Sequence, residues 1–161
     1  MRKKIEYEQI VLTVYSSIES ILEQLEKSVK RKAVNAFSST KGAFTDCNEL
    51  VEMIETRNKM LVFKATVDKV FERLSDEERI LFGYKYFNNR IIDGFDYKSR
   101  NYFRKQNKAL NHLGELLGYI GLCEKKFYDL YGNLKCVKSV LSALRNSKSV
   151  EDTDFVKELF G

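Results

Sequence analysis

The most restrictive feature of this chain is the complete absence of proline in 161 residues. Without proline, no position loses its backbone donor or clashes with the preceding turn, so long helices form at low cost. Apolar residues recur at spacings of three and four along most of the sequence, and the alternation typical of strands is not found. The content of 43% apolar and 12% aromatic residues is enough to form a buried core. We therefore predict an all-α fold.

The N-terminal part, residues 1–74, is predicted to form a long helical hairpin. Residues 38–42 are the expected loop, and Asp46 with Glu49 three residues later is typical of the cap that begins the second helix. Two long amphipathic helices have more apolar surface than a small neighbouring module covers, so we expect the hairpin to supply a dimer contact or another partner-binding surface. The first helix, over residues 5–36, is indicated by a stripe of Val11, Val14, Tyr15, Ile18, Ile21, Leu22, Leu25 and Val29.

Residues 75–120 are predicted to form a small module of two helices. Ser75 and Glu78 have the spacing of a capping box, in which each side chain accepts a hydrogen bond from the backbone amide of the other residue. The helix that follows is expected to end near Phe87. A second helix, capped by Asp96 or Ser99 and stopped at Gly118 or Gly121, is expected to bury Tyr102, Gln106, Ala109, Leu110, Leu113 and Leu117.

Residues 121–161 are predicted to form short helices that pack on this module. Two helices are indicated by apolar residues at helical spacing, and a last one by Ser149 with Asp152 three residues later, which is the spacing of a cap. The apolar residues of the three helices are Phe127, Leu130 and Leu134; Val137, Val140, Leu141 and Leu144; and Phe155, Val156, Leu159 and Phe160.

No catalytic or cofactor-binding motif is found in the sequence. The Walker loop, the dinucleotide-binding GxGxxG pattern, the zinc-peptidase HExxH pattern and the hydrolase GxSxG pattern are all missing. His112 is the single histidine and has no second ligand or thiol near it in the sequence, so we assign it no catalytic or metal-binding role. We therefore expect no enzymatic activity, no cofactor and no small-molecule substrate.

Cysteine usage and hydropathy bear on the compartment. Cys47, Cys123 and Cys136 are widely spaced and form no Cys-x-x-Cys pair, which disfavours a disulfide framework or a structural zinc site and predicts reduced thiols. Glu6 and Glu8 interrupt the apolar stretch that a signal peptide needs after its basic start. No later run approaches the roughly 20 apolar residues of a membrane span. We expect a cytoplasmic protein with no membrane contact.

The positive charge is concentrated in one segment. The net charge of +5 is modest, but residues 97–114 carry five cations and no acid. On a helix that buries Tyr102 and Leu113, these cations fall on the outer face. Solvated faces usually mix both signs of charge, whereas cations with hydrogen-bonding groups suit a DNA groove, where arginine grips guanine and lysine holds phosphate. The candidate DNA-binding residues are Lys98, Arg100, Asn101, Arg104, Lys105, Lys108 and His112.

Aromatic residues gather in the same region. Such rings are able to stack on exposed nucleobases. They also flank two amphipathic helices that must pack together, so we assign most of them to the core. The cluster consists of Tyr84, Tyr86, Phe87, Phe95, Tyr97, Tyr102 and Phe103.

Two stretches of the sequence together indicate a family. Residues 74–79 read LSDEER and precede the run YKYF at residues 84–87, and residues 99–105 read SRNYFRK and continue to Leu113. These stretches resemble the opening and the recognition helix of the fourth, promoter-reading region of bacterial sigma factors, a helix-turn-helix that small phage and mobile-element regulators carry in degenerate form. The segment between them, residues 88–98, is several residues shorter than the scaffold that the family places there.

The resemblance implies a DNA-binding transcriptional regulator that contacts DNA or RNA polymerase through the basic helix from Ser99. Double-stranded DNA, RNA polymerase and a second copy of the chain are then the expected partners, since a two-fold dimer sets two such helices in successive major grooves. An alternative of another class is a protein-binding adaptor or phage-encoded inhibitor that presents the same basic surface to an acidic protein.

Overall fold

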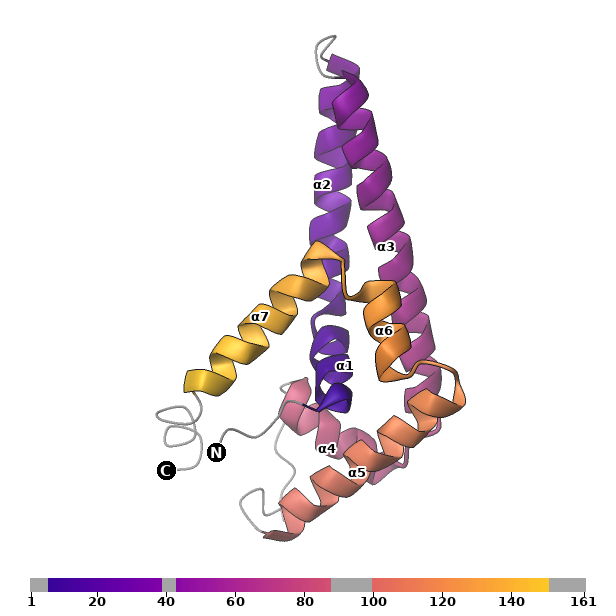
Figure 1. Cartoon of the computed structure of the whole chain (residues 1–161), viewed down its shortest axis with the longest axis vertical. Helices are drawn as coiled ribbons and strands as arrows, with labels where there is room; N and C mark the ends of the chain where they lie inside the picture. The colour runs from indigo at the N-terminus through magenta and orange to yellow at the C-terminus, as the bar shows by residue number, and fades with distance from the viewer. Residues whose placement is uncertain (1–5, 39–42, 88–99, 151–161) are drawn as a thin grey trace.

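A computed structural model describes residues 6–38, 43–87 and 100–150, and it contains seven helices and no strand within these ranges (Figure 1). The prediction of an all-α fold is therefore confirmed. The helices are α1 (Tyr7–Ser16), α2 (Ile18–Ser38), α3 (Ala43–Glu72), α4 (Asp76–Tyr86), α5 (Arg100–Tyr119), α6 (Glu124–Tyr131) and α7 (Lys135–Val150).

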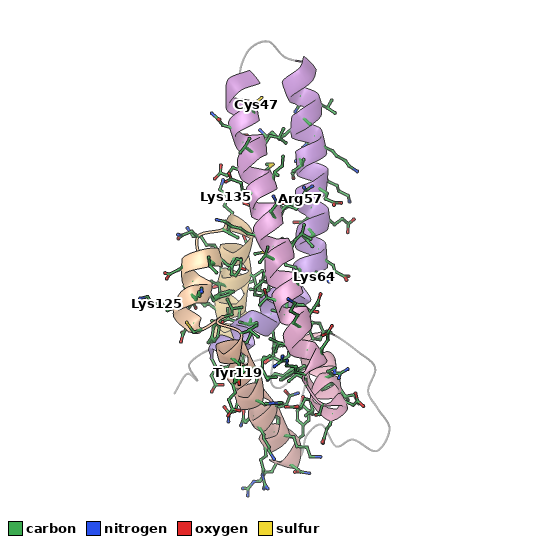
Figure 2. The ribbon with its side chains drawn as sticks, turned by 90° about the vertical axis from the view of Figure 1, so that its right-hand side faces the viewer. Cys47, Arg57, Lys64, Tyr119, Lys125 and Lys135 are labelled. Atoms are coloured by element: carbon green, nitrogen blue, oxygen red, sulfur yellow. The ribbon has the colours of Figure 1, made fainter. Side chains whose placement is uncertain are left out.

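The molecule has a projecting hairpin and a base. α2 and α3 lie side by side and antiparallel, and α1 extends from the lower end of α2 into the base (Figure 1). The remaining helices gather around α1 and the lower half of α3, and Figure 2 shows the same arrangement from a second direction. The basic helix α5 therefore lies at the end of the molecule opposite the hairpin tip.

The helix predicted over residues 5–36 is interrupted at Ser17. The amide of Ser17 donates to the carbonyls of both Thr13 and Val14, at 3.3 and 3.1 Å, and its hydroxyl donates to the Thr13 carbonyl at 3.1 Å. The hydroxyl of Ser16 donates to the same carbonyl at 2.8 Å. Back-bonding of this kind bends helices, so the prediction of one continuous helix was wrong at this point.

Two predicted caps were also wrong. α3 begins at Ala43, so Asp46 lies inside the helix, and α7 continues to Val150, so Ser149 is a helical residue and not the cap of a last helix. In both cases a polar residue with an acid three positions later is as compatible with a helix interior as with a cap. Residues 39–42 of the expected loop and the helix expected after residue 150 lie outside the described residues.

One buried core joins the parts of the base. α1 is central to it and contacts α2, α3, α4, α5 and α7. Three consecutive residues of α1, Ile10, Val11 and Leu12, are all buried because these neighbours cover several sides of the helix. Residues 1–74 are therefore not a separate hairpin, since their first helix also completes the core beneath α4 and α5.

The aromatic side chains of α6 pack on α1 and α3. The ring of Phe127 lies 5.8 Å from that of Tyr7 and 5.9 Å from that of Phe63, measured between centroids, and Tyr131 also contacts Phe63. The hydroxyl of Tyr7 donates to the carbonyl of Leu122 at 2.7 Å. α7 packs against α1. The C-terminal helices thus tie the base to the lower part of the hairpin.

α5 ends between the two glycines that were predicted to stop it. Gly118 lies within its last turn, and Gly121 has a φ of +87°. Glycine reaches this left-handed conformation without the steric penalty of a Cβ atom. The amide of Leu122 then donates to the carbonyl of Leu117 at 2.9 Å, which closes the end of α5 and turns the chain toward α6.

Candidate nucleic-acid interface

The first turn of α4 is held by the predicted capping box, which the structure confirms. The Ser75 hydroxyl accepts from the Glu78 amide at 3.2 Å, and the Glu78 carboxylate accepts from the Ser75 amide at 2.9 Å. Both bonds satisfy donors that a helix N-terminus otherwise leaves without partners. The turn also brings three acids together at one end of α4, namely Asp76, Glu77 and Glu78.

The inner face of α5 is the one that the sequence predicts. All six residues expected to be buried are no more than 4% exposed. The Gln106 amide nitrogen donates to the Leu81 carbonyl at 2.8 Å and to the Tyr102 hydroxyl at 3.0 Å. The bond to Leu81 joins α5 to the backbone of α4 and fixes the rotation of α5 there, so the opposite face has a defined direction. The six buried residues are Tyr102, Gln106, Ala109, Leu110, Leu113 and Leu117.

The outer face of α5 is open to solvent and carries no acid until Glu115. Four of the predicted DNA-binding residues have exposed side chains on this face. Two exposed asparagines, Asn107 and Asn111, extend it and were missed, although they continue the helical spacing set by Arg100 and Arg104. We define the open face of α5 as Arg100, Asn101, Arg104, Asn107, Lys108 and Asn111.

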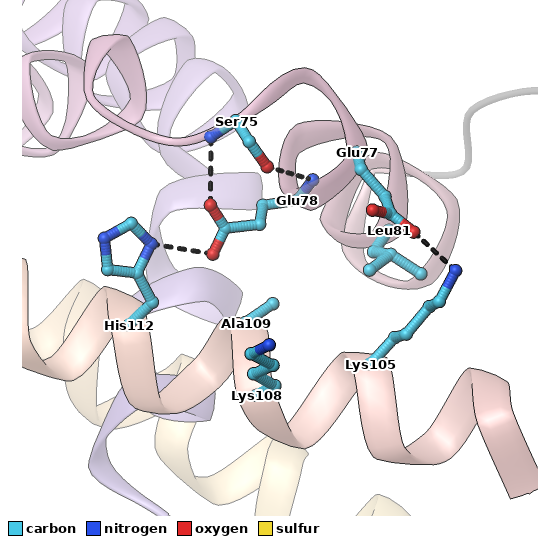
Figure 3. Close-up of a pocket in the computed structure, with 8 residues that line it drawn as sticks. All are labelled: Ser75, Glu77, Glu78, Leu81, Lys105, Lys108, Ala109 and His112. Atoms are coloured by element: carbon cyan, nitrogen blue, oxygen red, sulfur yellow. Dashed lines mark hydrogen bonds and ion pairs between the residues drawn. The ribbon is translucent and has the colours of Figure 1, made fainter.

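Two predicted DNA-binding residues, Lys105 and His112, are turned toward α4 (Figure 3). The Nζ atom of Lys105 lies 2.6 Å from a carboxylate oxygen of Glu77, and Nδ1 of His112 lies 2.7 Å from a carboxylate oxygen of Glu78. A helical projection of α5 places both residues at the edge of the outer face. It does not show the acids beside them, because these belong to α4 and their position depends on how the two helices pack. Lys98 lies outside the described residues.

A shallow hollow of about 380 Å³ lies between the first turn of α4 and α5 (Figure 3). Glu77 and Glu78 of α4 contact Lys105 and His112 of α5 across it, and Lys108 also lines it. The hollow is lined by Ser75, Glu77, Glu78, Leu81, Lys105, Lys108, Ala109 and His112.

Glu78 serves both the capping box and the contact with α5. Partial burial acts to raise the pKa of Glu78, but hydrogen bonds from Ser75 and the contact with His112 outweigh burial and hold the pKa below its usual value of 4.5. Glu78 is therefore ionised at neutral pH. The structure thus couples the start of α4 to the middle of α5 through one carboxylate.

Most of the aromatic cluster belongs to the core, as predicted. Phe103 is the exception, because its side chain is 46% exposed one helical turn before Asn107 of the open face. Phe95 and Tyr97 lie outside the described residues. The members that form or pack against the core are Tyr84, Tyr86, Phe87 and Tyr102.

Other kinds of site find little support in the described residues. Within these ranges no group of three or more His, Cys, Asp or Glu side chains is placed to hold a metal ion. No helix of the same ranges is both long and apolar enough to cross a membrane. The three cysteines are free, with Cys47 and Cys123 exposed and Cys136 half-buried.

Comparison of the chain with protein-family models, with curated proteins and with solved structures finds no match in any of the three. No relative therefore transfers a role to any of its residues. The function must be inferred from the charge, exposure and contacts of α4 and α5.

Proposed function

We propose that this protein is a DNA-binding transcriptional regulator that contacts duplex DNA, or RNA polymerase at a promoter, through the open face of α5. The proposal follows the resemblance of residues 74–117 to the promoter-reading region of sigma factors. The observation that carries it is the composition of the open face, which has three cations and three asparagines before the first acid on that side, Glu115. A solvated helix face normally mixes both signs of charge.

The side chains of the open face match the groups that a DNA duplex displays. Arg100 and Arg104 lie one helical turn apart, and a guanidinium donates two parallel hydrogen bonds to guanine or to phosphate. Asparagine pairs with the edge of adenine in a similar way, and Lys108 holds phosphate as a point charge. Because the major groove admits one α-helix, this face is suited to bind there.

The buried side of α5 supports this role mechanically. Leu113 and Leu117 are fully buried, and Gln106 bonds to the backbone of α4. A helix held in this way keeps its outward side chains in fixed relative positions, which base-specific contacts require. Substitutions of residues on the open face should therefore leave the fold intact.

The proposal is tested by reversing charge on the open face of the full chain and measuring its affinity for duplex DNA at low salt. Arg104→Glu with Lys108→Glu replaces two exposed cations by acids, and we expect affinity to fall by at least about tenfold. The matched control is Lys125→Glu with Lys126→Glu on α6, which makes the same charge change at two other exposed positions. Equal losses in both variants would indicate attraction to net charge alone, and no loss in either would exclude α5 from the interface.

A second candidate function is a protein-binding adaptor or inhibitor with an acidic partner. It is favoured by the contacts of Lys105 with Glu77 and of His112 with Glu78, because this edge of α5 already receives carboxylates. An acidic helix of another protein would make similar contacts with the open face. In that case duplex DNA would not bind, and the reversal at Arg104 and Lys108 would abolish capture of one defined acidic protein.

A further inference from the structure

One side of α3 carries apolar residues that no other described helix covers. Val51 and Val62 are 54% and 58% exposed, and Leu61 is 45% exposed, whereas Met60 and Phe63 on other sides of the helix are fully buried. Single exposed valines are ordinary on a protein surface, but several along one helix mark a partner-binding surface.

The exposed residues on this side of α3 have the spacing of a helix–helix seam. Successive positions are separated alternately by four and three residues, which is the repeat that keeps one face of a helix against a second helix. Every one of these positions is exposed. We define the α3 stripe as Val51, Glu55, Asn58, Val62, Ala65 and Lys69.

We infer that the part of the α3 stripe from Val51 to Val62 binds the same part of a second copy of this chain in antiparallel orientation. When Val51 of one copy lies opposite Val62 of the other, two-fold symmetry repeats the contact and sets Glu55 opposite Asn58. A carboxylate and an amide are able to share a hydrogen bond at that point. A parallel pair in register would instead place Glu55 against Glu55, where like charges repel.

The two edges of the stripe are also self-complementary in the antiparallel register. Along one edge, Lys59 of one copy lies between Glu52 and Glu55 of the other, and symmetry repeats this arrangement of opposite charges. Along the other edge, Leu61 of one copy lies beside Ile54 of the other, which adds apolar contact. A surface that matches itself in charge and hydropathy on both edges favours a second copy over an unrelated partner.

The mass of the full chain in solution, measured by sedimentation equilibrium over a wide concentration range, tests this inference. The wild type is expected to approach the mass of a dimer as concentration rises. Val62→Glu sets a carboxylate against Val51 of the other copy in place of an apolar contact, and this variant is expected to remain monomeric. The matched control is Leu130→Glu, which changes another exposed apolar residue, 43% exposed on α6, and should dimerise as the wild type does. A monomeric wild type, or a Val62→Glu variant that dimerises normally, would overturn the inference.

Charge exchange tests the antiparallel register separately and does not depend on the fold of the Val62 variant. Lys59→Glu places acids together along the charged edge, and we expect the dimer to weaken by about tenfold. Adding Glu55→Lys to the same chain restores opposite charges between copies and should recover much of the loss. A dimer that is indifferent to Lys59→Glu would contradict this register. The inference stands apart from the proposed function, because these masses are measured without DNA.

Discussion

At the scale of single residues, Glu77 lies where it would reduce the positive charge that α5 offers to a partner. Its carboxylate lies 2.6 Å from Nζ of Lys105, beside the open face. A phosphate that approaches this edge must compete for Lys105 and also meets the negative charge of Glu77. The acidic turn of α4 therefore opposes the binding that the open face favours.

Glu77→Gln is predicted to strengthen binding to duplex DNA. The substitution removes the negative charge that contacts Lys105, so affinity should rise by roughly threefold to tenfold. The salt dependence should steepen by the amount expected for about one additional phosphate contact. Affinity measurements at several salt concentrations provide the check. Asp129→Asn on α6 is the control, since it removes one exposed acid far from this turn in the sequence. An equal gain in the control, or no gain in the Glu77 variant, would contradict the competition.

Glu78 is predicted to stabilise the fold in a pH-dependent way. Its pKa in the folded protein lies below the usual 4.5, so its stabilising effect is present above that value and is lost as pH falls through the folded pKa. Glu78→Gln keeps the capping box, in which glutamine also serves, and removes the charge that faces His112. Thermal unfolding should therefore show a stability difference between wild type and variant at pH 7 that diminishes as the pH falls below 4.5. A difference that stays constant from pH 7 to pH 3 would show that the charge of Glu78 has no such role.

At the scale of helices, local features were predictable and the arrangement of neighbours was not. The capping box of Ser75 and Glu78 depends only on residues three apart, and the buried face of α5 follows from the periodicity of its own apolar residues. The side chain of Lys105 points toward α4, and this depends on where α4 lies. The periodicity of α5 alone does not predict the position of another helix. The open face of α5 was therefore predicted in outline, and its acidic border was missed.

The break at Ser17 shows a second limit of pattern reading. The apolar stripe continues across the break, because the serine remains close to helical geometry and buried residues lie on both sides of it, Val14 in α1 and Ile18 in α2. What bends the helix is competition among hydroxyl and amide donors for the carbonyl of Thr13. Serine and threonine residues are common on helix surfaces, so their presence alone did not predict the bend.

The buried face of α5 should contribute much more to stability than an exposed apolar position on α6. Leu113→Ala removes a fully buried side chain and is predicted to lower the free energy of unfolding by about 2–5 kcal/mol. Leu130→Ala, at a side chain 43% exposed, should cost less than about 1 kcal/mol. Urea unfolding of both variants provides the measurement. Similar losses in the two variants would mean that α5 is not packed as described.

At the scale of the whole molecule, the helices of the base depend on one another. α1 contacts α4, α5 and α7, and its residues Val11, Leu12 and Val14 are fully buried. The division into a hairpin, a module and C-terminal helices therefore describes the sequence better than it describes the packing. The open face of α5 is held in place by a core to which distant parts of the chain contribute.

Residues 75–120 are predicted not to fold when produced alone. In the whole protein α4 and α5 pack against α1, and an isolated pair of helices would expose the apolar residues that α1 covers. Circular dichroism during heating should show a gradual loss of partial helicity in the fragment and a cooperative transition in the full chain. A cooperative transition in the fragment would contradict the shared core.

The salt dependence of duplex binding by the full chain tests the central claim most directly. Three cations on the open face, Arg100, Arg104 and Lys108, predict a slope of about −3 for the logarithm of the association constant against the logarithm of salt concentration. The variant with glutamate at positions 104 and 108 should show a shallower slope, no steeper than about −1. The control variant on α6 should keep the slope of the wild type. Absence of duplex binding at low salt, or a slope unchanged by the reversal on α5, would contradict the proposal that this helix binds DNA.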